Sequence, residues 1–202
     1  QMSGTIFFIR HGQSEVNLAR LHDPDAYYSA DFLDAKLSEA GKDQAAGLQE
    51  RFGLGFRPDF VLTSSLHRAL STATIALAAH VGPSSRWIAL DSINESDVEF
   101  PEREAPLAGV SKPCNHRQSL SKDGKLQEFA HVDFGRYCSD EDLLGSENHA
   151  ELEARVSRFA RELQEITQTT ESVDLQIVVV AHYVVIRKLF EMFDGCASSF
   201  NF

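Results

Sequence analysis

Apolar and polar positions along this chain repeat with two different periods, and their order predicts strands separated by helices. Short runs of β-branched and aromatic residues without a polar face are typical of strands covered on both sides. They occupy residues 5–9, 60–63, 87–90 and 175–180. Apolar residues spaced three and four positions apart predict helices. These helices cover residues 37–52, 66–81, 147–167 and 183 to a point before Gly195.

Residues at the expected helix ends and one long apolar stripe support these assignments. Ser38 is suited to cap the first helix, and Gly82 with Pro83 is suited to end the second. The stripe of the third helix is expected to face the core; it comprises Leu152, Val156, Phe159, Leu163 and Ile166. Strands alternating with helices imply a mostly parallel sheet with helices on both faces. We therefore expect one α/β domain over residues 1–202, built as a three-layer α/β/α sandwich.

Residues 91–145 interrupt this alternation because they show no sustained period. A segment of this length inside a compact domain is usually functional, and we interpret it as an inserted lid over the sheet edge. A variable surface loop is the alternative. Six acidic residues lie between Asp91 and Glu104, and basic residues follow at Lys112, His116, Arg117, Lys122 and Lys125. The first four of these basic residues either hold a second phosphate or are solvated charges, and we favour the second interpretation.

Composition narrows the classes of partner. The 202 residues include 30 acidic and 19 basic ones, which gives a formal charge of −11 and an isoelectric point near 5.1. This charge disfavours nucleic-acid binding, and any bound anion needs a local cluster of cations. No apolar run reaches the ~20 residues of a membrane-spanning helix, and the N-terminus does not resemble a signal peptide. Cys114, Cys138 and Cys196 form no C-x-x-C pair, so we expect a reducing, cytoplasmic location without disulfides.

Chemically unusual residues follow three of the four predicted strands. Arg10 and His11 follow the first strand, Arg68 lies shortly after the second, and His182 follows the last. The carboxyl ends of parallel strands share one edge, where open α/β sheets bind ligands. Four potential cations repel one another unless an anion lies among them, and a phosphoryl group suits two planar guanidinium groups. We expect Gly12 to be small because a side chain there would crowd such a ligand.

Four motifs, in this order, resemble the histidine phosphatase superfamily, whose fold is also called phosphoglycerate mutase-like. The motifs are IRHGQS with Asn17 just beyond it, LSEAGKDQA, TSSLHRALSTA and VVVAHYVVIRKL. The resemblance covers residues 5 to about 90 and 147 to about 193, and it touches the inserted segment only at one carboxylate. One position departs from the pattern: Tyr183 follows His182, where the family usually has glycine.

The resemblance implies a catalytic role for each residue at the strand ends. His11 corresponds to the nucleophile that becomes a transient phosphohistidine, and the family holds its other ring nitrogen by a hydrogen bond to backbone. Arg10, Arg68 and His182 correspond to the residues that surround the transferring oxygens. Because these cations stabilise the developing charge, no metal ion or other cofactor is expected.

The resemblance also implies a proton donor and further polar contacts. An alkoxide leaves more readily when it is protonated as it departs, and Glu95 stands at the position of the family's acid. Asp97 and Glu99 are close enough in sequence to be rivals. The same carboxyl group would then activate water to hydrolyse the phosphohistidine. Ser14 and Asn17 are expected to contact the phosphate or its leaving group.

These residues favour a metal-independent phosphatase that acts on a small-molecule phosphate monoester, and we expect phosphate or sulfate ions to bind in the site. A phosphoglycerate mutase is the enzymatic alternative, although cofactor-dependent mutases have a longer, more basic insertion. A non-catalytic domain, in which Tyr183 and the lid present a surface for a partner, is the third hypothesis. The eight histidines show no H-x-x-x-H or Cys-paired motif, so we set a metal site aside. The substrate and the oligomeric state are not predicted.

Overall fold

The sheet at the centre of the molecule has four parallel strands in the order β1-β4-β2-β3. The computed structural model describes residues 3–98, 111–168 and 174–193. Within them, the strands are β1 (Ser3–Arg10), β2 (Phe60–Ser64), β3 (Arg86–Leu90) and β4 (Asp174–Ala181). Each predicted strand is therefore confirmed and extends by one or two residues at one or both ends.

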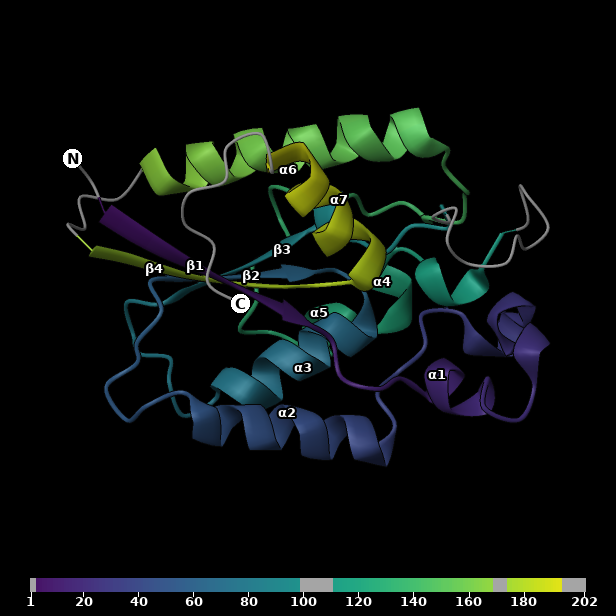
Figure 1. The fold of residues 1–202 in the computed structure, drawn as a ribbon, viewed down its shortest axis with the longest axis horizontal. Helices are drawn as coiled ribbons and strands as arrows, with labels where there is room; N and C mark the ends of the chain where they lie inside the picture. The colour runs from purple at the N-terminus through teal and green to yellow at the C-terminus, as the bar shows by residue number, and fades with distance from the viewer. Residues whose placement is uncertain (1–2, 99–110, 169–173, 194–202) are drawn as a thin grey trace.

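Helices cover both faces of this sheet (Figure 1). One face packs against α2 (Glu39–Arg51) and α3 (His67–Leu77), and the other against α6 (His149–Gln168) and α7 (Tyr183–Phe193). The shorter helices are α1 (Glu15–Ala19), α4 (Leu120–Asp123) and α5 (Lys125–Glu128). Short 3₁₀ helices cover Pro24–Tyr28, Ala30–Phe32, Asp91–Ile93 and Pro113–Asn115. The chain thus has the three-layer α/β/α architecture that its periodicity predicts, although α3 ends at Leu77 rather than at residue 81.

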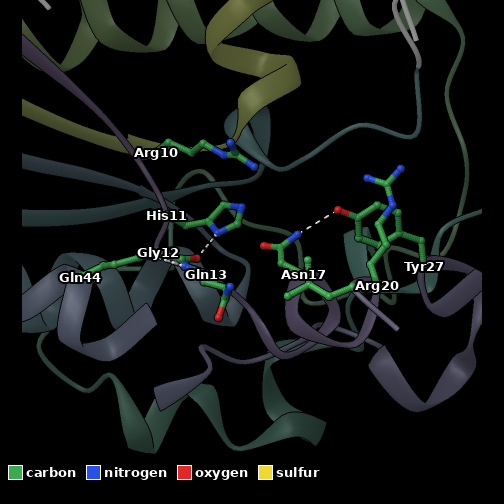
Figure 2. Close-up of a pocket in the computed structure, with 9 residues that line it drawn as sticks. Arg10, His11, Gly12, Gln13, Asn17, Arg20, Tyr27 and Gln44 are labelled. Atoms are coloured by element: carbon green, nitrogen blue, oxygen red, sulfur yellow. Dashed lines mark hydrogen bonds between the residues drawn. The ribbon is translucent and has the colours of Figure 1, made fainter. Parts of the chain in front are cut away.

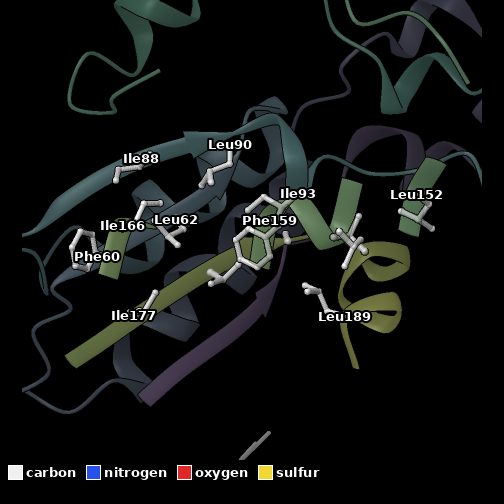
Figure 3. Close-up of a cluster of buried hydrophobic side chains, with 14 of the residues drawn as sticks. Phe60, Leu62, Ile88, Leu90, Ile93, Leu152, Phe159, Ile166, Ile177 and Leu189 are labelled. Atoms are coloured by element: carbon white, nitrogen blue, oxygen red, sulfur yellow. The ribbon is translucent and has the colours of Figure 1, made fainter. Parts of the chain in front are cut away.

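The largest apolar core lies between the sheet and α6 (Figure 3). Four residues of the predicted stripe are at most 3% exposed, and Leu163 is partly buried beside them; the four are Leu152, Val156, Phe159 and Ile166. They meet strand residues that include Leu62, Ile88 and Ile177. The prediction that this stripe faces the core is confirmed.

Strand register brings the candidate residues to one edge of the sheet. Arg10 pairs with Ala181, so His11 and His182 are the next residues of two adjacent strands. The His11 backbone N–H continues the ladder by donating to the Ala181 carbonyl at 3.1 Å. On the other side of β4, β2 ends at Ser64, and α3 with Arg68 begins three residues later.

The described part of the inserted segment packs against the edge strand β3, so the expected lid is not confirmed. Asp133 accepts a backbone hydrogen bond from Ala89 and donates one to Trp87, both at 2.9 Å. Apolar side chains from the segment form a further core with Leu70 and Ala89; they are Leu120, Phe129, Val132 and Phe134. Burial of these side chains fixes residues 111–145 to the sheet edge. Residues 99–110, which include Glu99, lie outside the described residues.

Arg117 and His116 of this segment are buried against carboxylates, so the interpretation as solvated charges is wrong for these two residues. Arg117 is 0% exposed, and its Nη2 atom lies 2.9 Å from both carboxylate oxygens of Asp91. Its Nε atom donates to Ser65 Oγ at 2.9 Å. Three further contacts with carboxylates join His116 to Asp97 and buried Lys125 to both Asp34 and Asp123. Lys122, with 63% side-chain exposure, is solvated as expected.

Two other expectations concern the described residues only. None of the helices within them is long and apolar enough to cross a membrane. Cys114 and Cys138 are free thiols, and Cys196 lies outside the described part of the chain.

We predict that Arg117→Ala lowers the free energy of unfolding by about 3–5 kcal/mol, because it leaves Asp91 buried without its partner. Lys122→Ala, in the same segment, should change this free energy by less than about 0.5 kcal/mol because the side chain is solvated. Urea unfolding followed by circular dichroism measures both values. Equal effects of the two substitutions would contradict the buried ion pair.

Candidate active site

The two ring nitrogens of His11 have different partners. Nδ1 lies 2.6 Å from the carbonyl oxygen of Gly12, and because a carbonyl oxygen only accepts, Nδ1 carries the hydrogen. Nε2 therefore holds the lone pair, and Nε of Arg68 donates to it at 3.3 Å. The backbone hydrogen bond implied by the resemblance is thus present. This arrangement presents Nε2 as the nitrogen that is able to act as a nucleophile.

Burial keeps the His11 ring neutral. Desolvation, followed by the positive charge of Arg68, holds the pKa of His11 well below the ordinary 6.5, while the hydrogen bond to Gly12 opposes this shift. A lowered pKa means that the ring loses its proton at a lower pH than a free histidine does. His11 is therefore available as an unprotonated base in weakly acidic solution.

Arg68 lies inside the protein with only 3% of its surface exposed. Besides its contact with His11, it donates from Nη1 to the Cys114 carbonyl at 2.5 Å and from Nη2 to Asn115 Oδ1 at 3.0 Å. Both acceptors are uncharged, so neither neutralises the guanidinium group. No sequence motif indicated that residues of the inserted segment would hold Arg68.

His182 is fully buried beside His11, with ring centroids 4.9 Å apart. Its Nε2 atom lies 2.8 Å from Ser64 Oγ. Because Ser64 Oγ donates to Asn94 Oδ1 at 2.6 Å, it accepts from His182. Nδ1 of His182 has no hydrogen-bond partner within the described residues. Desolvation and the charge of Arg68 hold the pKa of His182 well below its ordinary value, and a bound anion would favour protonation at Nδ1.

Arg10 is exposed at the end of β1, and its guanidinium carbon lies 5.5 Å from the centre of the Tyr183 ring. Tyr183, the residue that departs from the family pattern, lines the same cavity as Arg10 and His11. The ring therefore borders the site instead of being confined to the helix interface. A cation over an aromatic face gains about 0.5–1 kcal/mol at an exposed position, so Tyr183 contributes to the placement of Arg10.

Two carboxyl groups of one loop have opposite pKa shifts. Desolvation raises the pKa of Glu95 above its ordinary value, although the charge of Arg68 opposes the shift. Burial also raises the pKa of Asp97, but hydrogen bonds from His116, the Lys112 amide and Asn115 outweigh it, so that pKa is lowered. When the pKa values of two neighbouring carboxyl groups shift in opposite directions, one group is more often protonated and the other more often charged. Glu95 thus keeps its proton to a higher pH than Asp97, which is a carboxylate held by its partners.

A small cavity of about 90 Å³ brings most of the candidate residues together. Its lining includes Arg10, His11, Ser14, Asn17, Arg68 and Glu95. His182 is not part of this lining, although its ring lies 4.9 Å from the ring of His11. Ser14 caps α1 and donates from Oγ to Asn17 Oδ1 at 2.8 Å, while Asn17 Nδ2 donates to Tyr27 Oη at 2.9 Å. Ser14 and Asn17 are therefore ordered at the cavity wall, and the sequence did not indicate Tyr27 as their partner.

A second cavity of about 530 Å³ adjoins the first and opens beside His11. Figure 2 shows Arg10 and His11 on one side of the cavity and Arg20 with Tyr27 on the other side. Asn17 lies between these two sides. The Arg20 guanidinium carbon lies 4.8 Å from the centre of the Tyr27 ring. The remaining wall comes from Gly12, Gln13, Leu21 and Gln44. This volume falls within the range of small-molecule binding sites.

Gly12 is small for a reason other than the expected one. A Cβ atom at this position would lie 2.5 Å from the backbone oxygen of Gly41 in α2, and one at Gly41 would lie 2.0 Å from the Gln13 oxygen. The close approach of two backbone segments therefore requires glycine here, whatever space a ligand needs. The Gly12 N–H donates to Thr72 Oγ1 at 3.0 Å, which ties His11 to α3.

Comparison with known proteins identifies the family. The model of the histidine phosphatase superfamily (branch 1) matches residues 6–200. The chain belongs to this superfamily. A 2,3-bisphosphoglycerate-dependent phosphoglycerate mutase from Chelativorans is 37% identical over 196 residues, which are 96% of this chain and 83% of the relative.

Two solved structures have the same fold at low sequence identity. Phosphoglycerate mutase from Bacillus anthracis is 19% identical with a TM-score of 0.56. The match covers 99% of this chain and 84% of the mutase. A mycobacterial glucosyl-3-phosphoglycerate phosphatase is 22% identical with a TM-score of 0.51. The match covers 92% of this chain and 77% of the phosphatase. The fold is therefore shared by mutases and phosphatases, and membership alone does not choose between them.

The described residues contain no group of three His, Cys, Asp or Glu side chains that could hold a metal ion. Burial raises the pKa of the Cys114 thiol to about 11, so this thiol is not a nucleophile near neutral pH. Among the described residues that border the small cavity, the nucleophile with the most suitable environment is the His11 ring.

We predict that His11 titrates below pH 6.5 in the wild-type protein and that Arg68→Gln raises its pKa, because the substitution removes a nearby positive charge. The pKa should stay below the ordinary value since the ring remains desolvated. Arg20→Gln is the control, because exposed Arg20 is not among the causes of the shift. NMR titration of ¹⁵N-labelled histidine measures the pKa. A fully protonated His11 at pH 6.5 in the wild type would contradict this account.

Proposed function

We propose that this protein is a metal-independent phosphatase that hydrolyses small-molecule phosphate monoesters through a phosphohistidine on His11. The observation that carries the proposal is the unprotonated Nε2 atom of His11, which accepts a hydrogen bond from Arg68 in a cavity shared with Arg10 and Glu95. Nε2 attacks phosphorus and the bond to the leaving oxygen breaks, while Glu95 gives that oxygen its proton. Water then attacks phosphorus while the Glu95 carboxylate takes its proton, and the bond between phosphorus and Nε2 breaks with its electron pair returning to Nε2, which restores both residues.

The cations have separate roles in the proposed step. Arg10 and Arg68 hold the non-bridging oxygens and stabilise their charge as the phosphoryl group transfers. His182, once protonated at Nδ1, adds a third donor. Ser14 and Asn17 supply polar groups at the same wall. The proposal takes residues 1–202 as one histidine phosphatase domain.

The opposite pKa shifts favour the reactive protonation state. Attack needs neutral His11, and departure of an alkoxide needs protonated Glu95. With ordinary values of 6.5 and 4.5, few molecules would have both groups in these forms at any pH. The lowered pKa of His11 and the raised pKa of Glu95 bring the two titration ranges closer, which increases the fraction of molecules in the reactive protonation state.

Two observations favour hydrolysis over the mutase alternative. Transfer within a bisphosphate intermediate needs several cations for the second phosphate. Arg117 and His116 of the inserted segment pair with Asp91 and Asp97 instead, so fewer basic side chains, among them Arg20, remain for it. The cavity of about 530 Å³ beside His11 also gives room for water and for a leaving group larger than glycerate. A coupled assay for interconversion of 2- and 3-phosphoglycerate tests the alternative, and turnover faster than hydrolysis would reverse this preference.

We predict that the wild-type protein hydrolyses 4-nitrophenyl phosphate in the presence of EDTA and that His11→Ala lowers kcat/KM at least about a thousandfold, since the covalent route is lost. His22→Ala is the matched control because His22 is exposed, and it should retain the wild-type rate. Equal rates for wild type and His11→Ala would contradict the proposal. A protein that binds phosphate without forming an adduct in rapid-quench trapping would be a binding domain.

We predict that Glu95→Gln lowers kcat/KM, which reports the steps up to phosphoryl transfer to His11, for an alkyl phosphate by about 10²–10⁴-fold, because no acid protonates the alkoxide. The loss should be much smaller for 4-nitrophenyl phosphate, whose leaving group departs without protonation. Since the pKa of Glu95 is raised, the acid form persists to higher pH than for an ordinary glutamate, and wild-type activity on the alkyl ester should fall as pH rises through that pKa. Equal losses for both substrates would exclude Glu95 as the acid.

A further inference from the structure

Arg68 requires a fixed orientation that its own long side chain does not provide. Its Nε atom must face His11 while the guanidinium plane stays directed at the phosphoryl oxygens, and each free rotation of the side chain opposes this geometry. In the structure, one edge of the guanidinium group is bound by the 3₁₀ turn Pro113–Asn115. The acceptors are the Cys114 carbonyl at 2.5 Å and Asn115 Oδ1 at 3.0 Å.

The orientation of the Asn115 amide is determined by its other contacts. Nδ2 donates to Asp97 Oδ1 at 2.9 Å and to the Ser96 carbonyl at 3.2 Å, and both of these atoms only accept. The oxygen of the amide must therefore point to Arg68. Asp97 is fixed in turn by His116 Nε2 at 3.0 Å and by the Lys112 N–H at 3.1 Å.

The same contacts fix the loop of the proposed acid. Ser96 and Asp97, which bind Asn115, are the two residues after Glu95, and the Ser96 N–H donates to Glu95 Oε1 at 3.0 Å. One amide side chain thus connects the guanidinium group that holds the phosphoryl oxygens with the loop that carries the proton donor. Its neutral charge matters, because a carboxylate at this place would compete with the phosphoryl group for Arg68.

We propose that Asn115 is a positioning residue. Its amide orients Arg68 toward His11 without neutralising the guanidinium group, and it fixes the position of the loop that carries Glu95. The inference rests on the proposed function for the role of Arg68, but it also makes predictions for phosphate binding that need no turnover. In this view Asp97 and His116 act through Asn115, and the carboxylate is kept one residue away from the guanidinium group.

The first test uses Asn115→Ala and inorganic phosphate or orthovanadate as the probe. The dissociation constant of the anion, measured by calorimetry, should rise at least about tenfold. The value of kcat should fall by a larger factor than KM changes, because the guanidinium group of Arg68 is no longer held toward the transferring oxygens. Asn148→Ala is the matched control: Asn148 accepts from the Ala150 and Glu151 N–H groups at the start of α6. It should lower the melting temperature and leave anion binding unchanged.

A second variant separates orientation and charge from stability. The double variant Asp97→Asn with Asn115→Asp exchanges the amide and the carboxylate, so the net charge is unchanged. The amide now at position 97 is able to donate to the carboxylate at position 115 while its oxygen accepts from His116 and from the Lys112 N–H. Two changes remain: a carboxylate faces Arg68, and the hydrogen bond from position 115 to the Ser96 carbonyl is lost. We expect a melting temperature within a few degrees of the wild type, at least about tenfold weaker vanadate binding, and a higher pKa of His11 by NMR.

These outcomes distinguish the inference from the proposed function. If Asn115→Ala and the double variant both bind vanadate like the wild type, with His11 titration unchanged, the positioning role is wrong. If Asn115→Ala does not fold, the double variant alone decides. A wild-type protein that binds vanadate but never hydrolyses an ester would contradict the proposed function, while the binding measurements would still support or overturn the role of Asn115.

Discussion

The site depends on one buried imidazole whose two nitrogens are assigned different tasks by their neighbours. The Gly12 carbonyl takes the hydrogen of Nδ1, and Arg68 approaches Nε2 at 3.3 Å. Burial and that guanidinium group keep the ring neutral, so Nε2 retains its lone pair next to a cation that attracts an anion. Strand register puts His182 beside this ring, and the packing of α3 against the sheet brings Arg68 to it.

This constraint also explains how an acidic chain keeps positive charge available at one place. The structural cations are paired with carboxylates: Arg117 with Asp91, Lys125 with Asp34 and Arg155 with Glu147. The hydrogen-bond and ring partners described for the cations at the site are uncharged. Arg68 donates to a carbonyl and an amide, and Arg10 and Arg20 lie over the rings of Tyr183 and Tyr27. Uncharged partners orient a guanidinium group and leave its charge for a ligand.

The sequence predicted the sheet and the strand-end residues well because both are local signals. Buried parallel strands are apolar throughout, and His11 and His182 follow their strands directly. Arg117 was misjudged because its partners Ser65 and Asp91 lie 52 and 26 positions away, and no local period reports a buried charge. Asn115 was missed for the same reason, since its contact with Arg68 spans 47 positions. The position of Glu95 followed from family resemblance, whereas its environment emerges only from the fold.

The most direct test of this account is a crystal structure of the protein with orthovanadate, which mimics the transferring phosphoryl group. The account predicts vanadium within bonding distance of His11 Nε2, with its oxygens contacted by Arg10, Arg68 and His182 and its apical oxygen near Glu95. Vanadate bound away from His11, or bound there while Arg68 points elsewhere, would contradict the central claim that these groups converge on one phosphoryl group.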